Sequence, residues 1–285
     1  MNKKTKVSII CNTFNHEKYI RDALEGFVAQ QTNFPFEVLI HDDASTDRTA
    51  DIIREYEEKY PDIINPIYQK ENKYSLKIPI SATYQYPRVK GEYVAFCEGD
   101  DYWTDPLKLQ KQYDALESHP DIDICAHASV TISAVDGTVL RYNKRLQKNG
   151  VIPTETVIDG GGGYVASASL FYRKALLDNI PPFRQMYGLD YTMQVHGALR
   201  GGMYYLSDEM SVYRDGVPNS ATQRLRSDIK KKIANGNRVY QVLKQLDIDT
   251  NRKYHKLILK KRVINRLRQI YYYCAKIKIT SDDIT

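Results

Sequence analysis

Short runs of β-branched and aromatic residues recur through the first part of the chain, each bounded by polar or turn-forming residues. Runs of this length and composition are typical of buried β-strands, because alternate side chains then pack on both faces of a sheet. They predict strands at Lys6–Cys11, Phe36–His41, Ile64–Tyr68 and Tyr93–Cys97.

Between these runs the apolar residues repeat with helical spacing. The pattern predicts helices at Glu17–Gln31, at Thr49–Tyr60, which ends before Pro61, and around Leu107–Ser118. Strands and helices that alternate at this spacing form βαβ units. The sequence therefore predicts an α/β fold, a Rossmann-like and mostly parallel sheet flanked by helices.

The rest of the chain is less regular. Strands are predicted near residues 126–133 and 204–206, with a helix from Tyr191 to about Arg200. The run Gly160–Gly163 predicts a flexible loop, which either lies beside a ligand site or is a purely structural turn. From Gln223 onward the pattern is helical, so we expect one domain at residues 1–222 and a helical extension at residues 223–285.

Acidic residues directly follow two of the predicted strands. Asp42 and Asp43 follow the second strand, and Glu98-Gly99-Asp100-Asp101 follows the fourth. Because ligands of open α/β sheets bind outside the carboxyl ends of the strands, these side chains and Thr13 are expected to converge. Carboxylates in this arrangement suit Mg²⁺ or Mn²⁺, which also bind substrate phosphates. A solvated acidic turn is the alternative interpretation of Asp100-Asp101 alone.

The composition excludes several classes of protein. Of 285 residues, 42% are hydrophobic and 27% charged, which is typical of a globular protein. No run approaches the roughly 18 apolar residues of a membrane span. Asn12 and Asn15 interrupt the N-terminal apolar run too early for a signal peptide, so we expect a cytoplasmic protein. The widely spaced cysteines are predicted to be reduced core thiols: Cys11, Cys97, Cys125 and Cys274.

Three segments jointly resemble the GT-A glycosyltransferases of family 2: KVSIICNTFNHEKYIRDALEGFVAQ, VLIHDDASTDRTADIIREY and GEYVAFCEGDDYWTDPLKLQKQ. The resemblance covers about residues 5–215 and is greatest to bacterial enzymes that build capsular, cell-wall or lipopolysaccharide glycans on a lipid carrier. It implies an inverting, metal-dependent hexosyl- or N-acetylhexosaminyltransferase. The donor would be a nucleotide sugar, a UDP-sugar in particular, and the acceptor a lipid-linked glycan.

The resemblance also implies roles for individual residues. Thr13 matches the position that lines the nucleotide base, and Asp43 matches the carboxylate that contacts uracil. Glu98 stands where the family carries an Asp that approaches the ribose. Asp100 matches the acid that binds Mn²⁺ or Mg²⁺, and Asp101 extends this motif toward the metal or the donor sugar.

Asp190, in MYGLDYTM, falls where the family carries the second acid of a Glu-Asp pair, which is the catalytic base. Here the first acid is replaced by Leu189. Family members often carry a metal-binding His shortly after a Tyr-Arg near the end of the domain, but this chain has VYRDGVPNS. Asp215 either replaces that His as an oxygen ligand or belongs to a loop, and we favour the loop.

Chemical reasoning supports the same reaction. Transfer from a nucleoside diphosphate sugar requires stabilisation of the leaving diphosphate and a carboxylate base for the acceptor hydroxyl. A sugar nucleotidyltransferase is the main alternative, but the loop CNTFNHEKY after the first strand lacks the glycines of that class. A nucleic-acid-binding protein is a second alternative, although no known binding motif for RNA or DNA is present, and we expect no nucleic-acid partner.

The charge is concentrated in the C-terminal segment. Residues 223–278 hold 17 of the 41 Lys and Arg residues and only 3 of the 35 Asp and Glu residues, a net charge of +14. An apolar stripe that includes Ile264, Leu267 and Tyr271 has helical spacing there. Basic amphipathic helices bind anionic membrane surfaces, which would make the protein a peripheral component of the inner face of the cell membrane. Alternatively, the stripe packs onto the domain or onto a second copy in a homodimer.

Overall fold

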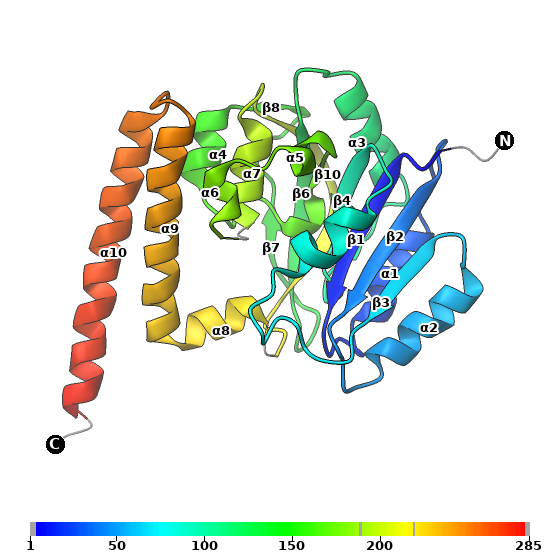
Figure 1. The fold of residues 1–285 in the computed structure, drawn as a ribbon, viewed down its shortest axis with the longest axis horizontal. Helices are drawn as coiled ribbons and strands as arrows, with labels where there is room; N and C mark the ends of the chain where they lie inside the picture. The colour runs from blue at the N-terminus through cyan, green and yellow to red at the C-terminus, as the bar shows by residue number, and fades with distance from the viewer. Residues whose placement is uncertain (1–3, 188–189, 219, 283–285) are drawn as a thin grey trace.

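One mixed sheet organises the molecule, with strand order β3-β2-β1-β4-β9-β6-β10-β5 (Figure 1). The computed structural model describes residues 4–187, 190–218 and 220–282. Four strands of the first half are parallel to their neighbours, and their positions agree with the predicted ones to within a few residues. These strands are β1 (Val7–Thr13), β2 (Phe36–Asp42), β3 (Ile64–Tyr68) and β4 (Tyr93–Phe96).

The second half of the sheet introduces antiparallel pairs. β10 runs parallel to β6, whereas β9 is antiparallel to both β4 and β6. Short β5 and β8 pair antiparallel with β10, and β7 pairs antiparallel with β6. The strands are β5 (Tyr102–Trp103), β6 (Ile124–Ser133), β7 (Val139–Asn143), β8 (Gly150–Ile152), β9 (Phe171–Arg173) and β10 (Met203–Asp215).

Two apolar layers cover the two faces of the sheet. Successive residues of β1 point to opposite faces, so Ile9 packs in one cluster and Ile10 in the other. The first cluster takes in α1 (Ile20–Val28), α2 (Thr49–Lys59) and α3 (Lys108–Glu117). The second takes in α4 (Thr154–Gly160), α5 (Ala175–Asp178), α6 (Pro182–Gln185) and α7 (Asp190–Ala198). Irregular single turns lie at Ser81–Gln85, Tyr86–Arg88 and Ser167–Ser169.

Three helices form the C-terminal part: α8 (Ala221–Ser227), α9 (Ile229–Asp249) and α10 (His255–Asp282). α9 and α10 lie side by side at one end of the molecule (Figure 1). Gly236 of α9 faces the side chain of Gln269 on α10, and a Cβ there would lie 1.3 Å from Gln269 Nε2, so that side chain would have to move. α9 also contributes Val242 and Leu243 to the second apolar cluster, so this part of the extension shares a core with the α/β body.

The structure decides the prediction for the cysteines. Cys11, Cys97 and Cys125 are buried thiols as predicted, but Cys274 is exposed on α10, so the prediction of a core thiol is wrong for that residue. Its helix packs through one face only, and Cys274 lies on another. Trp103 packs in the core, with its ring edge-on to Phe27.

Candidate active site

The carboxyl ends of β1, β2 and β4 lie at one edge of the sheet. The backbone N–H of Asp43 donates to the carbonyl of Thr13 (3.0 Å), and Gly99 N–H donates to the carbonyl of Asn12 (3.0 Å). Because the three strands are parallel neighbours, the loops that follow them meet here. The predicted residues Thr13 and Asp43 are therefore adjacent, with the Glu98–Asp101 segment beside them.

Gly99 allows this segment to lie against the end of β1. A Cβ at Gly99 would come within 2.8 Å of both Cβ and Oγ1 of Thr13, a separation that packed atoms do not reach. The neighbouring residues, Glu98 and Asp100, consequently belong to a backbone that touches the end of β1. The Oγ1 atom of Thr13 is buried and has no hydrogen-bond partner among the described residues.

Asp43 is held by a loop that is distant in sequence. Its Oδ1 accepts a hydrogen bond from Lys73 N–H (2.7 Å) and its Oδ2 one from Tyr74 N–H (2.9 Å). Asp42 turns away into its own loop, where its carboxylate accepts from the Ser45 hydroxyl and backbone. Of the two adjacent acids, Asp43 therefore orders the loop after β3, and Asp42 caps the turn that leads to α2.

Asp101 and Arg214 hold the acidic segment, Glu98–Asp101, against β10. Asp101 is 1% exposed, and its Oδ1 accepts the Arg214 backbone N–H (3.0 Å). The Arg214 guanidinium donates through Nη1 to the Asp100 carbonyl (2.8 Å) and through Nη2 to Asp22. It also lies over the rings of Tyr102 and Tyr19, at 4.4 Å and 5.2 Å from their centroids. Sequence reasoning missed this residue, although the Tyr-Arg in VYRDGVPNS was the available signal.

Four acids share one region of negative charge. Desolvation raises the pKa of Glu98 well above its usual range, and the charges of Asp100, Asp190 and Asp101 raise it further. Asp101 shows the same rise in pKa, from burial first and then from Asp100. Glu98 and Asp190 are both exposed to solvent, so a ligand can reach them. Desolvation also raises the pKa of Asp190, the first residue of α7.

His16 also faces the acidic segment, which the sequence did not indicate. Its Nε2 lies 3.9 Å from Asp100 Oδ2, and its side chain is 17% exposed. Desolvation lowers the pKa of His16, although the charge of Asp100 opposes this shift, so the ring is neutral near pH 7. His16 follows β1 by three positions and is carried there by the loop that begins at Thr13.

The acidic segment fits a divalent cation that its substrate helps to bind. Asp101 Oδ2 is buried without a hydrogen-bond partner among the described residues, and several carboxylates face one another with few cations between them. In the part of the chain that the structure describes, no three His, Cys, Asp or Glu side chains are already gathered around one point. A cation at Asp100 would therefore take most of its ligands from water or from a bound anion, as Mg²⁺ commonly does.

Other predicted candidates lie elsewhere. Asp208 and Glu209 belong to β10, and Asp208 pairs with Lys111 (2.7 Å). Asp215 is the last residue of β10 and pairs with Arg226 of α8 (2.6 Å). Leu189, which precedes the predicted base, lies outside the described residues.

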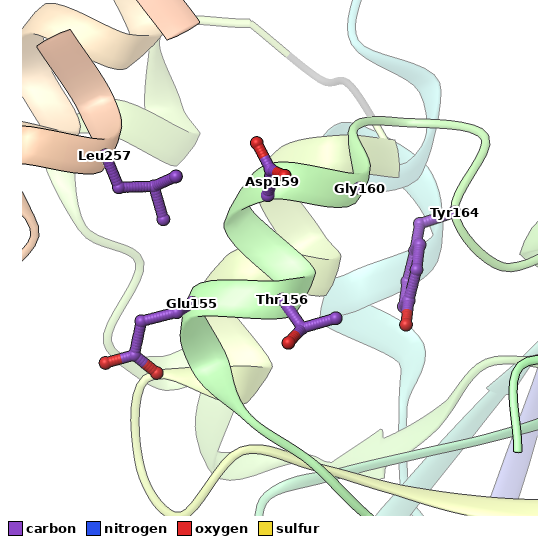
Figure 2. Close-up of a pocket in the computed structure, with 6 residues that line it drawn as sticks. All are labelled: Glu155, Thr156, Asp159, Gly160, Tyr164 and Leu257. Carbon is purple, nitrogen blue, oxygen red and sulfur yellow. The ribbon is translucent and has the colours of Figure 1, made fainter. Parts of the chain in front are cut away.

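The glycine run lies beside the helix that begins with Asp190. Gln194 of α7 donates its amide to the carbonyl of Gly162 (3.0 Å), and a Cβ on Gly162 would touch Tyr191. A separate cavity of about 350 Å³ lies next to the run between α4 and α10 (Figure 2). It contains none of the predicted site residues; its lining is Glu155, Thr156, Asp159, Gly160, Tyr164 and Leu257.

Comparison with known proteins defines the class. The family model described as glycosyl transferase family 2 matches residues 8–180. An uncharacterized protein of Mycobacterium tuberculosis is 38% identical over 211 residues, which cover 73% of this chain and 58% of that protein. The chain thus spans little more than half of that relative.

Solved structures show the same fold. The chain superposes on a crystal structure of Staphylococcus aureus TarS with UDP-GlcNAc, with a TM-score of 0.67 and 19% identity, over 93% of this chain and 73% of that chain. It also superposes on the mannosyltransferase PcManGT from Pyrobaculum calidifontis with GDP-Man and Mn²⁺, with a TM-score of 0.60 and 16% identity, over 98% and 76% of the two chains. The fold is therefore the predicted GT-A fold with a C-terminal helical extension.

The chain belongs to glycosyl transferase family 2. This membership favours the predicted glycosyltransferase over the sugar nucleotidyltransferase.

Proposed function

We propose that this protein is an inverting glycosyltransferase that moves a sugar from a nucleotide-sugar donor, a UDP-sugar in particular, to a lipid-linked cell-surface glycan. The proposal rests on one observation above all. Glu98, Asp100, Asp101 and Asp190 come from two distant segments of the chain, and they lie close enough that the charges of Asp100 and Asp190 raise the pKa of both Glu98 and Asp101. This acidic group adjoins Thr13 and Asp43, the proposed base-binding positions.

A single displacement accounts for the chemistry. The acceptor hydroxyl oxygen forms a bond to the anomeric carbon while the bond from that carbon to the diphosphate oxygen breaks. The electron pair leaves with the diphosphate, and Asp190 accepts the hydroxyl proton. Attack opposite the leaving group inverts the anomeric centre, so one base is enough. A raised pKa makes the carboxylate of Asp190 a stronger base than an Asp with the ordinary pKa.

The remaining acids bind and orient the donor. Asp43 and Thr13 would contact the base, Glu98 the ribose, and Asp101 would hold the segment against Arg214. Asp100 would hold Mn²⁺ or Mg²⁺, which when bound stabilises negative charge on the diphosphate as a Lewis acid. PcManGT, crystallised with Mn²⁺ and GDP-Man, and TarS, crystallised with UDP-GlcNAc, support a metal and a nucleotide sugar as ligands of this fold.

Two substitutions test the assignment of roles. Asp100→Ala should abolish metal-dependent UDP binding and transfer, measured by calorimetry and by release of UDP from a panel of UDP- and GDP-sugars. Asp190→Asn should lower turnover by about 10² to 10⁴ while UDP affinity stays near that of the wild type. Asp208→Asn is the matched control, because its carboxylate pairs with Lys111 outside the site. Unchanged turnover in Asp190→Asn would reject it as the base.

Peripheral membrane association would bring the enzyme to a lipid-linked acceptor. Among the described residues no helix is long and apolar enough to span a bilayer. α10 instead exposes apolar side chains such as Val263, Leu267 and Ile270 to solvent, with Lys260 and Arg266 exposed beside them. An amphipathic basic helix of this kind suits an anionic lipid surface. The same face would serve a homodimer, which is the competing assignment.

A further inference from the structure

His16 is a largely buried imidazole whose ring nitrogens make no hydrogen bond within the described chain. Its Nδ1 is buried and unpaired, and its Nε2 faces Asp100 Oδ2 at 3.9 Å, beyond hydrogen-bond distance. Buried polar atoms are nearly always paired, because an unpaired one loses its hydration without compensation. In the same acidic segment, Asp101 Oδ2 also lacks a partner among the described residues, and Asp101 is only 1% exposed. Of the two ring nitrogens, Nε2 is the one that faces Asp100 and is placed to share a ligand with it.

The loop that carries His16 is rigid. The His16 backbone N–H donates to Thr49 Oγ1 (2.8 Å), and the flanking Asn15 and Glu17 N–H groups donate to Ser45 Oγ (2.9 Å) and Asp47 Oδ2 (3.1 Å). The main chain of the loop is therefore tied to the start of α2 on both sides of His16. The imidazole is thus directed toward Asp100 by contacts that do not involve its own ring nitrogens.

One cation can reach both His16 Nε2 and Asp100 Oδ2. Bonds of about 2.1 Å from a cation to an imidazole nitrogen and to a carboxylate oxygen can together span up to about 4.2 Å. The observed 3.9 Å between Nε2 and Oδ2 lies within that span. Asp215 at the end of β10 is not free for this role, because it pairs with Arg226.

We propose that His16 Nε2 is a protein ligand of the divalent cation, together with Asp100, and that this nitrogen makes the site favour Mn²⁺ over Mg²⁺. The proposal rests on the metal-dependent function above. Mg²⁺ strongly prefers oxygen ligands, whereas imidazole nitrogen binds transition-metal ions better. The diphosphate and water would supply the other ligands.

Pulsed electron paramagnetic resonance tests the coordination directly. With Mn²⁺ and UDP added to the full chain, the echo envelope should show modulation from a coordinated ¹⁴N, and this should change when histidine is labelled with ¹⁵N. His16→Gln keeps a polar group of similar reach and should lose the nitrogen modulation. Mn²⁺ affinity with UDP should fall about 10- to 100-fold, with a smaller loss for Mg²⁺. His255→Gln, whose ring pairs with Asp247 in the extension, is the control and should behave as the wild type.

The results of these experiments test the His16 assignment separately from the proposed glycosyltransferase function. Sugar transfer with bound Mn²⁺ but no nitrogen modulation would overturn the His16 assignment and leave the glycosyltransferase standing. Nitrogen modulation that disappears in His16→Gln, in a protein that transfers no sugar, would support the ligand and reject the function. If His16→Gln weakens UDP equally with and without metal, His16 contacts the diphosphate instead and the assignment is wrong. A thermal melt of each variant checks that it is folded.

Discussion

At the scale of single residues, Arg214 is the side chain on which the acidic segment most depends. It is only 9% exposed and contacts the Asp100 carbonyl, Asp22 and two tyrosine rings. Arg214→Ala should lower the free energy of unfolding by about 1–3 kcal/mol, since it leaves the Asp100 carbonyl without its donor and removes the packing against two tyrosine rings. It should also weaken metal-dependent UDP binding, because the backbone of Asp100 loses its contact with the guanidinium, whereas the hydrogen bond from the Arg214 backbone N–H to Asp101 is kept. Chemical denaturation and calorimetry measure the two effects.

Two further substitutions serve as comparisons for Arg214→Ala. Arg214→Lys retains the charge but cannot reproduce the forked hydrogen bonds or the stacking. It should therefore restore little of the stability or of the UDP affinity that Arg214→Ala loses. Arg21→Ala removes a comparable pair with Glu55 on the surface, where both side chains are about half exposed, and should cost at most about 1 kcal/mol. If Arg214→Ala binds UDP as tightly as the wild type, the acidic segment keeps its position without the Arg214 side chain.

Lys108 is a second residue with a testable effect, in this case on how stability depends on pH. It is fully buried, and its Nζ donates a hydrogen bond to Gln112 Oε1 (2.7 Å) and lies 3.8 Å from the Trp103 ring centroid. Burial lowers the pKa of Lys108 to about 7. Between this pKa and the unfolded value of 10.5, the unfolded chain binds the extra proton. Lys108 therefore makes the folded state more stable as pH rises through this range.

The pH dependence can be isolated by comparing variants. The unfolding free energy of the wild type minus that of Lys108→Met should increase between about pH 7.5 and pH 9.5 in urea denaturation. Lys111→Met is the control with the opposite shift: Asp105 and Asp208 raise the pKa of Lys111, so its contribution is constant until the pH exceeds the unfolded value. If the difference in unfolding free energy between the wild type and Lys108→Met does not change over this pH range, Lys108 is charged in the folded protein.

At the scale of secondary-structure elements, the position of α7 determines where Asp190 lies. Gly197 faces Ile124 of β6, and a Cβ there would come within 2.6 Å of the Ile124 Cβ. Gly197→Ala should therefore displace α7, lower stability by about 1–3 kcal/mol and reduce turnover more than UDP affinity. Gly163→Ala is the control, because no atom of the described residues lies within 4 Å of the place that its Cβ would take. Equal turnover in the two variants would contradict this account of α7.

At the scale of the whole molecule, the outer face of α10 has no partner within the described chain. Leu267 and Ile270 are 61% and 58% exposed, so the predicted stripe does not pack onto the body. The intact protein should co-sediment with vesicles containing anionic lipid and dissociate at high salt, because each nearby Lys or Arg contributes about 1 kcal/mol and salt screens it. The double substitution Leu267→Asn and Ile270→Asn should reduce this binding.

The matched control removes similar apolar surface elsewhere. Val139 and Leu140 on β7 are 52% and 53% exposed, and replacing both by Asn should leave vesicle binding unchanged. Light scattering on the same samples distinguishes the alternative. A dimer that the α10 substitutions dissociate, in a protein that ignores anionic vesicles at low salt, would assign this face to a second copy of the chain.

The sequence by itself determined the parts of the fold that depend on local pattern. β1 to β4 and α1 to α3 carry clear period-two or helical signals and lie within a few residues of their predicted ranges. The rule that ligands meet the carboxyl ends of parallel strands then brought Thr13, Asp43 and Glu98–Asp101 to one edge without knowledge of the tertiary structure. Whether each performs its predicted role remains to be tested.

Only the tertiary structure decided which distant residues complete the site. The hydrogen bond from Arg214 to Asp101 joins positions 113 residues apart, and the approach of His16 to Asp100 depends on how the loop after β1 folds back over α2. Short β5 and β9 exist because longer neighbours pair with them, which no local pattern encodes. The exposure of the α10 stripe was equally undecided, since an apolar helical face has the same sequence whether it is buried or free.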